Sequence, residues 1–203
     1  MVGKASIILG IEVLNSLKDA NFKKGDRKMQ IPRKPKDEIL REAEAKGYEF
    51  EQIYHGCAQC VLAPLMEIFN IKQPEAFKAA TGLAGGIGLS VEGSCGGLIG
   101  GAMALGLIYG RELDKIEDPK DLRFISYRLA NKLHERFVHE YGSSICKEIQ
   151  KKVAGRVYHL NNPEEWDAFM AAGGHTDKCP GVVGKATRWA AEIIMEEAEN
   201  QEV

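Results

Sequence analysis

Five cysteines are the residues of this chain with the clearest capacity for chemistry. Four are far apart in the sequence, and each starts or flanks a predicted helix: Cys57, Cys95, Cys146 and Cys179. The fifth, Cys60, forms a Cys-x-x-Cys pair with Cys57. Scattered cysteines often serve as small buried apolar residues, but repeated placement at helix starts beside glycine is not typical of core filling. A helix N-terminus lowers the pKa of a thiol and favours the thiolate, which binds metals and attacks disulfides.

A glycine-rich segment surrounds Cys95 and allows three interpretations. It contains Gly82, Gly85, Gly86, Gly88, Gly93, Gly96, Gly97, Gly100 and Gly101. A phosphate-binding loop would need a preceding strand or a Gly-Lys-Ser/Thr sequence, and neither is present. The glycines could instead permit two helices to pack closely. The interpretation we favour is that they let backbone amides approach the Cys95 sulfur, because such hydrogen bonds stabilise a thiolate or a cluster sulfide.

The cysteine pattern resembles a family of redox-active proteins named C_GCAxxG_C_C. The first motif is similar to Tyr54-His55-Gly56-Cys57-Ala58-Gln59, and the second to Gly93-Ser94-Cys95-Gly96-Gly97-Leu98-Ile99-Gly100-Gly101. Tyr141-Gly142-Ser143-Ser144-Ile145-Cys146 resembles the third and Lys178-Cys179-Pro180 the fourth. The resemblance covers roughly residues 43–191 and implies a helical, redox-active domain with four functional cysteines.

The chain departs from that family pattern at defined positions. Neither glycine-bracketed segment is a complete Gly-Cys-Ala-x-x-Gly, and Cys60 stands where a small polar residue is expected. The same cysteine framework occurs in the split-Soret cytochromes, which are helical and dimeric and have an iron–sulfur site beside haem. A covalent c-type haem requires Cys-x-x-Cys-His, whereas Val61 follows Cys60, so covalent haem is excluded.

We expect Cys57, Cys95, Cys146 and Cys179 to converge on one buried metal site, with an iron–sulfur cluster as the preferred cofactor. Two other interpretations stay open. In one, Cys57 cycles between dithiol and disulfide with Cys60 or Cys95. In the other, the module is structural and binds zinc or nothing, although zinc ligands usually come in two close pairs. Residues expected around the sulfurs are His55, Gly93, Gly96, Gly97 and His175. For His175, an exposed position in a loop is the interpretation we favour.

Composition restricts the class of protein. The 203 residues carry 27 basic and 29 acidic side chains, so the net charge of −2 would not recruit nucleic acid or a membrane surface. No apolar stretch approaches the roughly 20 residues of a membrane helix. The apolar run 7–11 is interrupted by Glu12 and is interpreted as an ordinary helix rather than a signal peptide. We therefore expect a cytoplasmic protein without structural disulfides.

The elements that must position the cysteines are predicted to be helices, and the fold class to be all-α. Helical periodicity indicates segments 5–20, 36–46, 57–69, 74–80, 98–109, 118–141, 163–172 and about 180–199, and one more helix carrying Cys146. Gly47 is expected to stop the second of these.

Two units are expected: an N-terminal helix and linker over residues 1–35, and a four-cysteine redox domain over 36–203. The apolar face of the first helix, from Ile7 to Leu17, must be buried somewhere. Together with the resemblance to a dimeric cytochrome, this predicts a homodimer in which residues 1–35 act as a dimerisation arm. The expected partner in function is an electron-transfer protein or a reductase.

Overall fold

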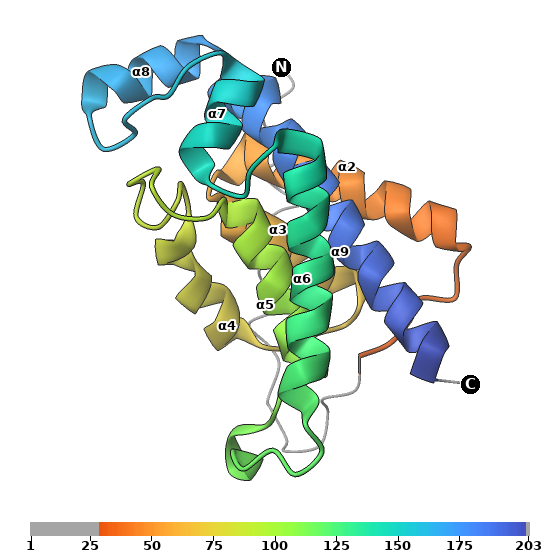
Figure 1. The fold of residues 1–203 in the computed structure, drawn as a ribbon. Coiled ribbons are helices and arrows are strands. Elements are labelled where there is room, and N and C mark those ends of the chain that lie inside the picture. The colour runs from red at the N-terminus through yellow and green to blue at the C-terminus, as the bar shows by residue number, and fades with distance from the viewer. Residues whose placement is uncertain (1–28, 202–203) are drawn as a thin grey trace.

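The computed structural model describes residues 29–201, and it confirms the all-α class. Eight α-helices form within this range (Figure 1): α2 (Lys36–Tyr54), α3 (Cys57–Ile68), α4 (Pro74–Ala79), α5 (Gly96–Tyr109), α6 (Leu122–Tyr141), α7 (Cys146–Ala154), α8 (Pro163–Ala171) and α9 (Cys179–Gln201). Short 3₁₀ turns cover Ala80–Leu83 (η1) and Leu113–Lys115 (η2), and a π-helical turn covers Gly174–Lys178 (η3). None of the helices in this part of the chain is both long and apolar enough to cross a membrane.

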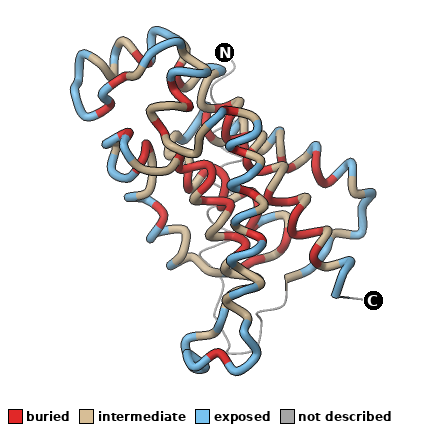
Figure 2. The backbone as a smooth tube through the Cα atoms, viewed as in Figure 1, coloured by how far each residue is buried: buried red, intermediate tan, exposed pale blue. Residues whose placement is uncertain are grey.

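The core lies where α2, α3, α5, α6 and α9 pack together, and α5 packs against α3, α6 and α9 (Figures 1 and 2). No residue from Gly96 to Tyr109 carries a charge, so α5 is apolar on every side and is stable only when surrounded by other helices. Fully buried side chains of the core include Leu105 of α5 itself and, on the other helices, Leu62, Leu65, Leu133, Phe137 and Ile193. The smaller cluster around Phe169 connects α7, α8 and the segment between them.

Glycines give α5 two faces that neighbouring helices can approach closely. A Cβ at Gly100 would overlap the Ala58 carbonyl of α3. On another side, a Cβ at Gly101 would lie 2.6 Å from Leu133 of α6 and 3.3 Å from Ala190 of α9. Close helix packing, one of the three interpretations of the glycine-rich segment, therefore accounts for these two glycines.

The prediction that Gly47 ends the second helix is wrong. The helix α2 continues for two further turns to Tyr54. Gly47 lies where α2 crosses α9, and a Cβ there would overlap the Thr187 hydroxyl. On the other helix, a Cβ at Gly184 would lie 2.9 Å from the Glu44 carbonyl oxygen. Because the crossing requires two small residues, Gly47 serves packing rather than termination.

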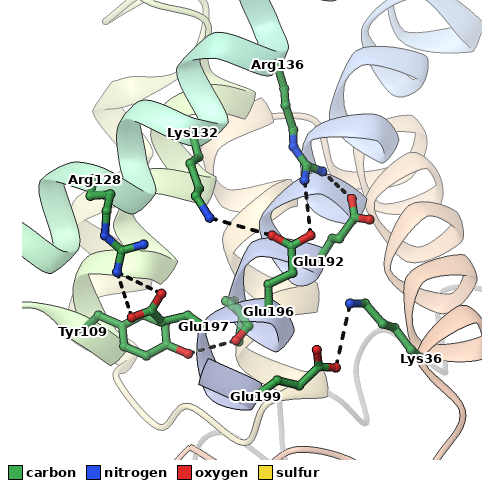
Figure 3. Close-up of polar contacts among 10 residues, drawn as sticks. Lys36, Tyr109, Arg128, Lys132, Arg136, Glu192, Glu196, Glu197 and Glu199 are labelled. Carbon is green, nitrogen blue, oxygen red and sulfur yellow. Dashed lines mark hydrogen bonds and ion pairs between the residues drawn. The ribbon is translucent and has the colours of Figure 1, made fainter. Parts of the chain in front are cut away.

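Ion pairs tie α6 to α9 along their outer faces (Figure 3). Arg128 donates to both carboxylate oxygens of Glu197 at 2.9 Å, Lys132 lies 4.0 Å from Glu196, and Arg136 pairs with Glu192 and Glu196. Most of these side chains are partly exposed, and such pairs contribute little stability. Glu197 differs because only 5% of it is exposed, so its bond to Arg128 satisfies a buried carboxyl group.

Other helix boundaries differ by a few residues from the expected ones. The helix α6 begins at Leu122 rather than at the Asp118-Pro119 pair, because the Asp118 carboxylate accepts the amide N–H groups of Leu122 and Arg123 at 2.8 and 3.0 Å. The helix α5 begins two residues early, at Gly96. The predicted helix 5–20, and with it most of the proposed 1–35 unit, lies outside the described residues.

Candidate functional site

Each of four cysteines stands at the beginning of a different helix. Cys57, Cys146 and Cys179 are the first residues of α3, α7 and α9, and Cys95 is the N-cap of α5. All four side chains line one cavity of about 110 Å³, called here the cysteine cavity. The structure thus brings together the four residues that the sequence analysis grouped. Whether they bind a metal stays a prediction.

A short antiparallel contact between two loops places Cys95 beside Cys146. The amide of Cys95 donates to the Ser144 carbonyl at 2.8 Å, and the amide of Cys146 donates to the Gly93 carbonyl at 2.9 Å. These bonds surround an isolated bridge between Ser94 and Ile145. In Figure 1 the beginnings of α5 and α7 accordingly lie close together. Gly93 therefore acts by joining the loops and does not line the cavity.

Cys57 is packed tightly against the beginning of α5. A Cβ at Gly96 would overlap the Cys57 sulfur and lie 3.0 Å from the Ala58 nitrogen. The amide of Gly85 points at the same sulfur, 3.5 Å away. Backbone hydrogen bonds from the amides of Gly97 and Leu98 favour the thiolate of Cys95 and lower its pKa, against the larger effect of burial. The favoured interpretation of the glycines concerned the Cys95 sulfur, and it applies at Gly97; Gly85 and Gly96 approach the Cys57 sulfur instead.

The loop before Cys95 has an unusual backbone. Five consecutive residues, 85–89, have positive φ between +56° and +72°, and they include Ile87 and Leu89. The left-handed conformation is costly for residues other than glycine, and such strain concentrates at functional sites. Gly86 is required here both for its positive φ and for space, since an added Cβ would lie 2.9 Å from the Cys146 Cβ. The loop supplies Ala84, Gly85 and Leu89 to the cavity wall.

Cys60 does not line the cysteine cavity although it is one turn from Cys57. Its side chain is buried, and its thiol donates a hydrogen bond to the His55 carbonyl at 3.0 Å. All five cysteines are free thiols. The structure therefore separates Cys60 from the other four.

Burial determines the charge of the thiols more strongly than helix position does. Burial raises the pKa of Cys95 to about 12, with a further rise from the Cys146 thiol, and raises the pKa of Cys146 to about 12. Burial and the nearby Glu51 carboxyl raise the pKa of Cys57 and of Cys179 well above the ordinary value. Desolvation of the thiolate therefore opposes the lowering of the pKa that is expected at helix starts. A bound cation would therefore have to displace protons from the four thiols.

An acid–base group forms one wall of the cavity: Glu51, His55 and His175. Nδ1 of His175 lies 3.3 Å from a Glu51 carboxyl oxygen, and the two imidazole rings have centroids 4.1 Å apart. The favoured prediction of an exposed His175 is wrong, since its side chain is only 9% exposed. Glu51 is a site residue that was not predicted, because it lies in the two turns of α2 beyond the expected end of the helix at Gly47.

Tyr48 and Gln52 hold the π-helical turn that carries His175. Both donate to the Thr176 carbonyl, at 3.2 and 2.5 Å. Glycine is required at position 174, since a Cβ there would overlap the Phe169 ring. π-Helical turns are frequent at functional sites, and this one places His175 and Cys179 on the same cavity.

The four cysteines are the residues of this cavity that could bind a metal cofactor. Among residues 29–201, no three His, Cys, Asp or Glu side chains surround one point closely enough for one metal ion. Four cysteines around a cavity are, however, the ligand set of common iron–sulfur clusters. The rest of the lining is mainly apolar, including Ile149, Leu160, Trp166 and Val182, and this shields the sulfurs from water.

Comparison with known proteins identifies a family. A family model described as "Putative redox-active protein (C_GCAxxG_C_C)" matches residues 55–193, which is more than half of the chain and includes all five cysteines. No curated protein and no solved structure matches the chain.

Proposed function

The chain belongs to the C_GCAxxG_C_C family, described as putative redox-active proteins, and we propose that its redox site is an iron–sulfur cluster bound by Cys57, Cys95, Cys146 and Cys179. The observation that carries this proposal is the placement of four separate helix starts around one shielded cavity. In this role the protein is an electron carrier or a redox sensor. When bound, an iron–sulfur cluster supplies one-electron chemistry at a potential set by its protein surroundings.

The residues around the cavity support a negatively charged cofactor. Helix N-termini carry a partial positive charge, which favours thiolates once a metal has displaced their protons. The Gly85 amide near the Cys57 sulfur adds a directed dipole. Hydrogen bonds to ligand sulfurs are one of the means by which proteins adjust cluster potentials.

A dithiol–disulfide cycle between Cys57 and Cys60 receives less support. Rapid exchange requires an accessible thiol with a lowered pKa. Burial raises the pKa of Cys60, and the nearby Glu51 carboxyl raises it further. In addition, the Cys60 thiol is bonded to the His55 carbonyl and does not line the cysteine cavity.

Anaerobic reconstitution with ferrous iron and sulfide tests the proposal. We expect equal amounts of iron and acid-labile sulfide in the protein, and broad visible absorption that dithionite bleaches and air restores. A colourless protein that takes up zinc but no sulfide would contradict the proposal and favour a structural metal site. Reversible loss of two titratable thiols without iron would favour the disulfide cycle.

A further inference from the structure

Exposed apolar side chains gather where α5 connects to α6. Leu113 and Ile116 lie in this connection, and Phe124 and Tyr127 lie in the first two turns of α6. Each of the four is at least 56% exposed, and in the rest of the described chain only Ile87 among the large hydrophobic side chains is as exposed. Single exposed apolar residues are common, but a group of them indicates an interaction site. These four residues are called here the tip patch.

The two aromatic rings of the tip patch are held in a fixed arrangement at the surface. Phe124 and Tyr127 pack edge to face with centroids 5.9 Å apart, and the Arg123 guanidinium lies 4.5 Å from the Phe124 centroid. Arg123 is itself paired with the buried Asp118 carboxylate at 2.9 Å. Rings that are already ordered lose little side-chain entropy when a partner covers them, so the tip patch is suited to binding.

The tip patch lies at the end of the molecule where the described chain begins. Both α3 and α5 begin at the cysteine cavity and pack against each other, so both run away from the cavity. The chain enters beside the end of α3, since the Gln30 amide donates to the Phe69 carbonyl at 3.0 Å. The α5–α6 connection follows the corresponding end of α5, and Figure 1 shows it far from α7 and α8. The sequence before Met29 is therefore attached at the same end as the tip patch.

The sequence before Met29 has the chemistry to cover this end. Its predicted helix 5–20 lies outside the described residues and has an apolar stripe that must be buried. The linker 21–28 carries four basic side chains and one acidic one, whereas the connection 112–121 carries five acidic and two basic ones. The connection stays acidic when Asp118 is counted with its partner Arg123.

These two segments are therefore complementary in charge as well as in their apolar surfaces. Opposite charges across a contact favour the correct partner and fix its register. An extended linker of this length spans up to about 28 Å, so it allows the helix to reach a neighbouring molecule.

We propose that the tip patch is the docking surface for the predicted helix 5–20 of a second copy of this chain. Exchange in both directions gives a closed two-fold dimer that buries two helices and two patches. A stable interface buries about 1,200–2,000 Å², and reciprocal contacts double the area that one helix supplies.

The second copy is assigned as the source because no other group of exposed apolar side chains on the described surface matches the tip patch as an interface for the predicted homodimer. The cysteine cavity lies at the other end of α5, so this dimer does not depend on the proposed cluster.

A double variant, Phe124→Ser with Tyr127→Ser, tests the surface by light scattering on a dilution series of the full chain. We expect the dissociation constant of the dimer to rise by about tenfold or more, because aromatic side chains carry a large share of interface energy. Both residues are exposed, so circular dichroism should show unchanged helix content. Val138→Ser is the matched control, because it removes another exposed apolar side chain from α6 outside the tip patch. It should leave the dissociation constant unchanged.

A cross-link identifies the source of the helix. Ile11 is replaced in the full chain by an apolar, photo-reactive benzophenone amino acid, which keeps the apolar stripe, and the protein is irradiated. We expect a product of twice the chain mass in which position 11 is joined to residues 113–127. A product joined within one chain, or joined between chains at other residues, would overturn the proposal. So would a full chain that is monomeric at high micromolar concentration, or a double variant that dimerises as tightly as the wild type.

Discussion

At the scale of single residues, the lack of a side chain at position 96 allows α5 to begin directly beside Cys57. Gly96→Ala would place a Cβ in contact with the Cys57 sulfur, the Ala58 nitrogen and the Leu83 carbonyl oxygen. Because backbone atoms cannot move aside easily, we expect a loss of about 1–3 kcal/mol in the free energy of unfolding. Cofactor content after reconstitution should fall as well, since the sulfur is displaced. Urea denaturation and iron analysis measure the two effects.

Gly106→Ala is the matched control in the same helix. The nearest atom to a Cβ at Gly106 is the Ser126 hydroxyl oxygen, 3.8 Å away. There the change should raise helix propensity and stabilise the protein by up to about 1 kcal/mol. If both variants behaved alike, the close approach of Gly96 to Cys57 would not matter for the site.

The Asp118 carboxyl should make the free energy of unfolding depend on pH, and the direction of this dependence follows from its lowered pKa. Burial opposes ionisation, but the amides of Arg123 and Leu122 and the Arg123 guanidinium lower the pKa of the Asp118 carboxyl. A lowered pKa in the folded state stabilises the fold above the unfolded pKa of about 3.9, and this contribution is lost as pH falls through the folded pKa. Asp118→Asn should therefore be less stable than the wild type at pH 7. The difference in the free energy of unfolding between the two proteins should become smaller as the pH falls.

Urea midpoints of the wild type and Asp118→Asn, compared at neutral pH and near pH 3, measure this effect. Asp114→Asn, which changes an exposed carboxyl before α6, is the control and should have a small effect at both values. A gap that widens on acidification would show that the carboxylate does not stabilise the start of α6.

The cysteines could be found from the sequence because their chemistry is a property of residue type. Their grouping could be proposed because each stands at a helix start, which is a local signal. Glu51 could not be found in this way, since its role comes only from burial against η3 and α3. His175 lies between glycines and an acidic residue, and this local pattern is typical of an exposed loop rather than of a cavity wall.

At the scale of helices, α2 and α9 depend on a close crossing at Gly47. Gly47→Ala should destabilise the protein by about 1–3 kcal/mol although alanine favours helix formation, because the added carbon overlaps the Thr187 hydroxyl. Combining it with Thr187→Ala should restore part of the loss. Thermal unfolding followed by circular dichroism tests both variants. A stabilised Gly47→Ala protein would mean that the helices separate readily at this point.

Helical periodicity predicted most of the helices, because each buries one apolar face. The residues of that face recur every three or four positions in the sequence. The errors occur where tertiary contacts overrule local preference. Gly47 resembles a stop signal but is buried in a helix crossing. In segment 85–89, Ile87 and Leu89 adopt the left-handed backbone conformation, which side chains of their type disfavour. Hydrogen bonds within the loop, such as that from the Gly93 amide to the Gly86 carbonyl, maintain it.

At the scale of the whole molecule, the proposed homodimer and the 1–35 arm stay predictions. The apolar stripe from Ile7 to Leu17 falls outside the described residues, and the expectation rests on sequence pattern alone. Deletion of residues 1–28 should convert a dimer to a monomer in light scattering while the reconstituted protein keeps its visible absorption. A full-length protein that is monomeric at high micromolar concentration would contradict the dimer.

The measurement that most directly tests the account is the iron and sulfide content of five single Cys→Ala variants after anaerobic reconstitution. We expect the variants of Cys57, Cys95, Cys146 and Cys179 to lose cofactor by roughly tenfold or more, since even partners behind metal ligands cost 10–100-fold in affinity. The Cys60→Ala variant should keep wild-type content because its thiol faces the His55 carbonyl. Wild-type iron and sulfide in any of the first four variants, or their loss from the Cys60 variant alone, would contradict a single site built from four helix starts.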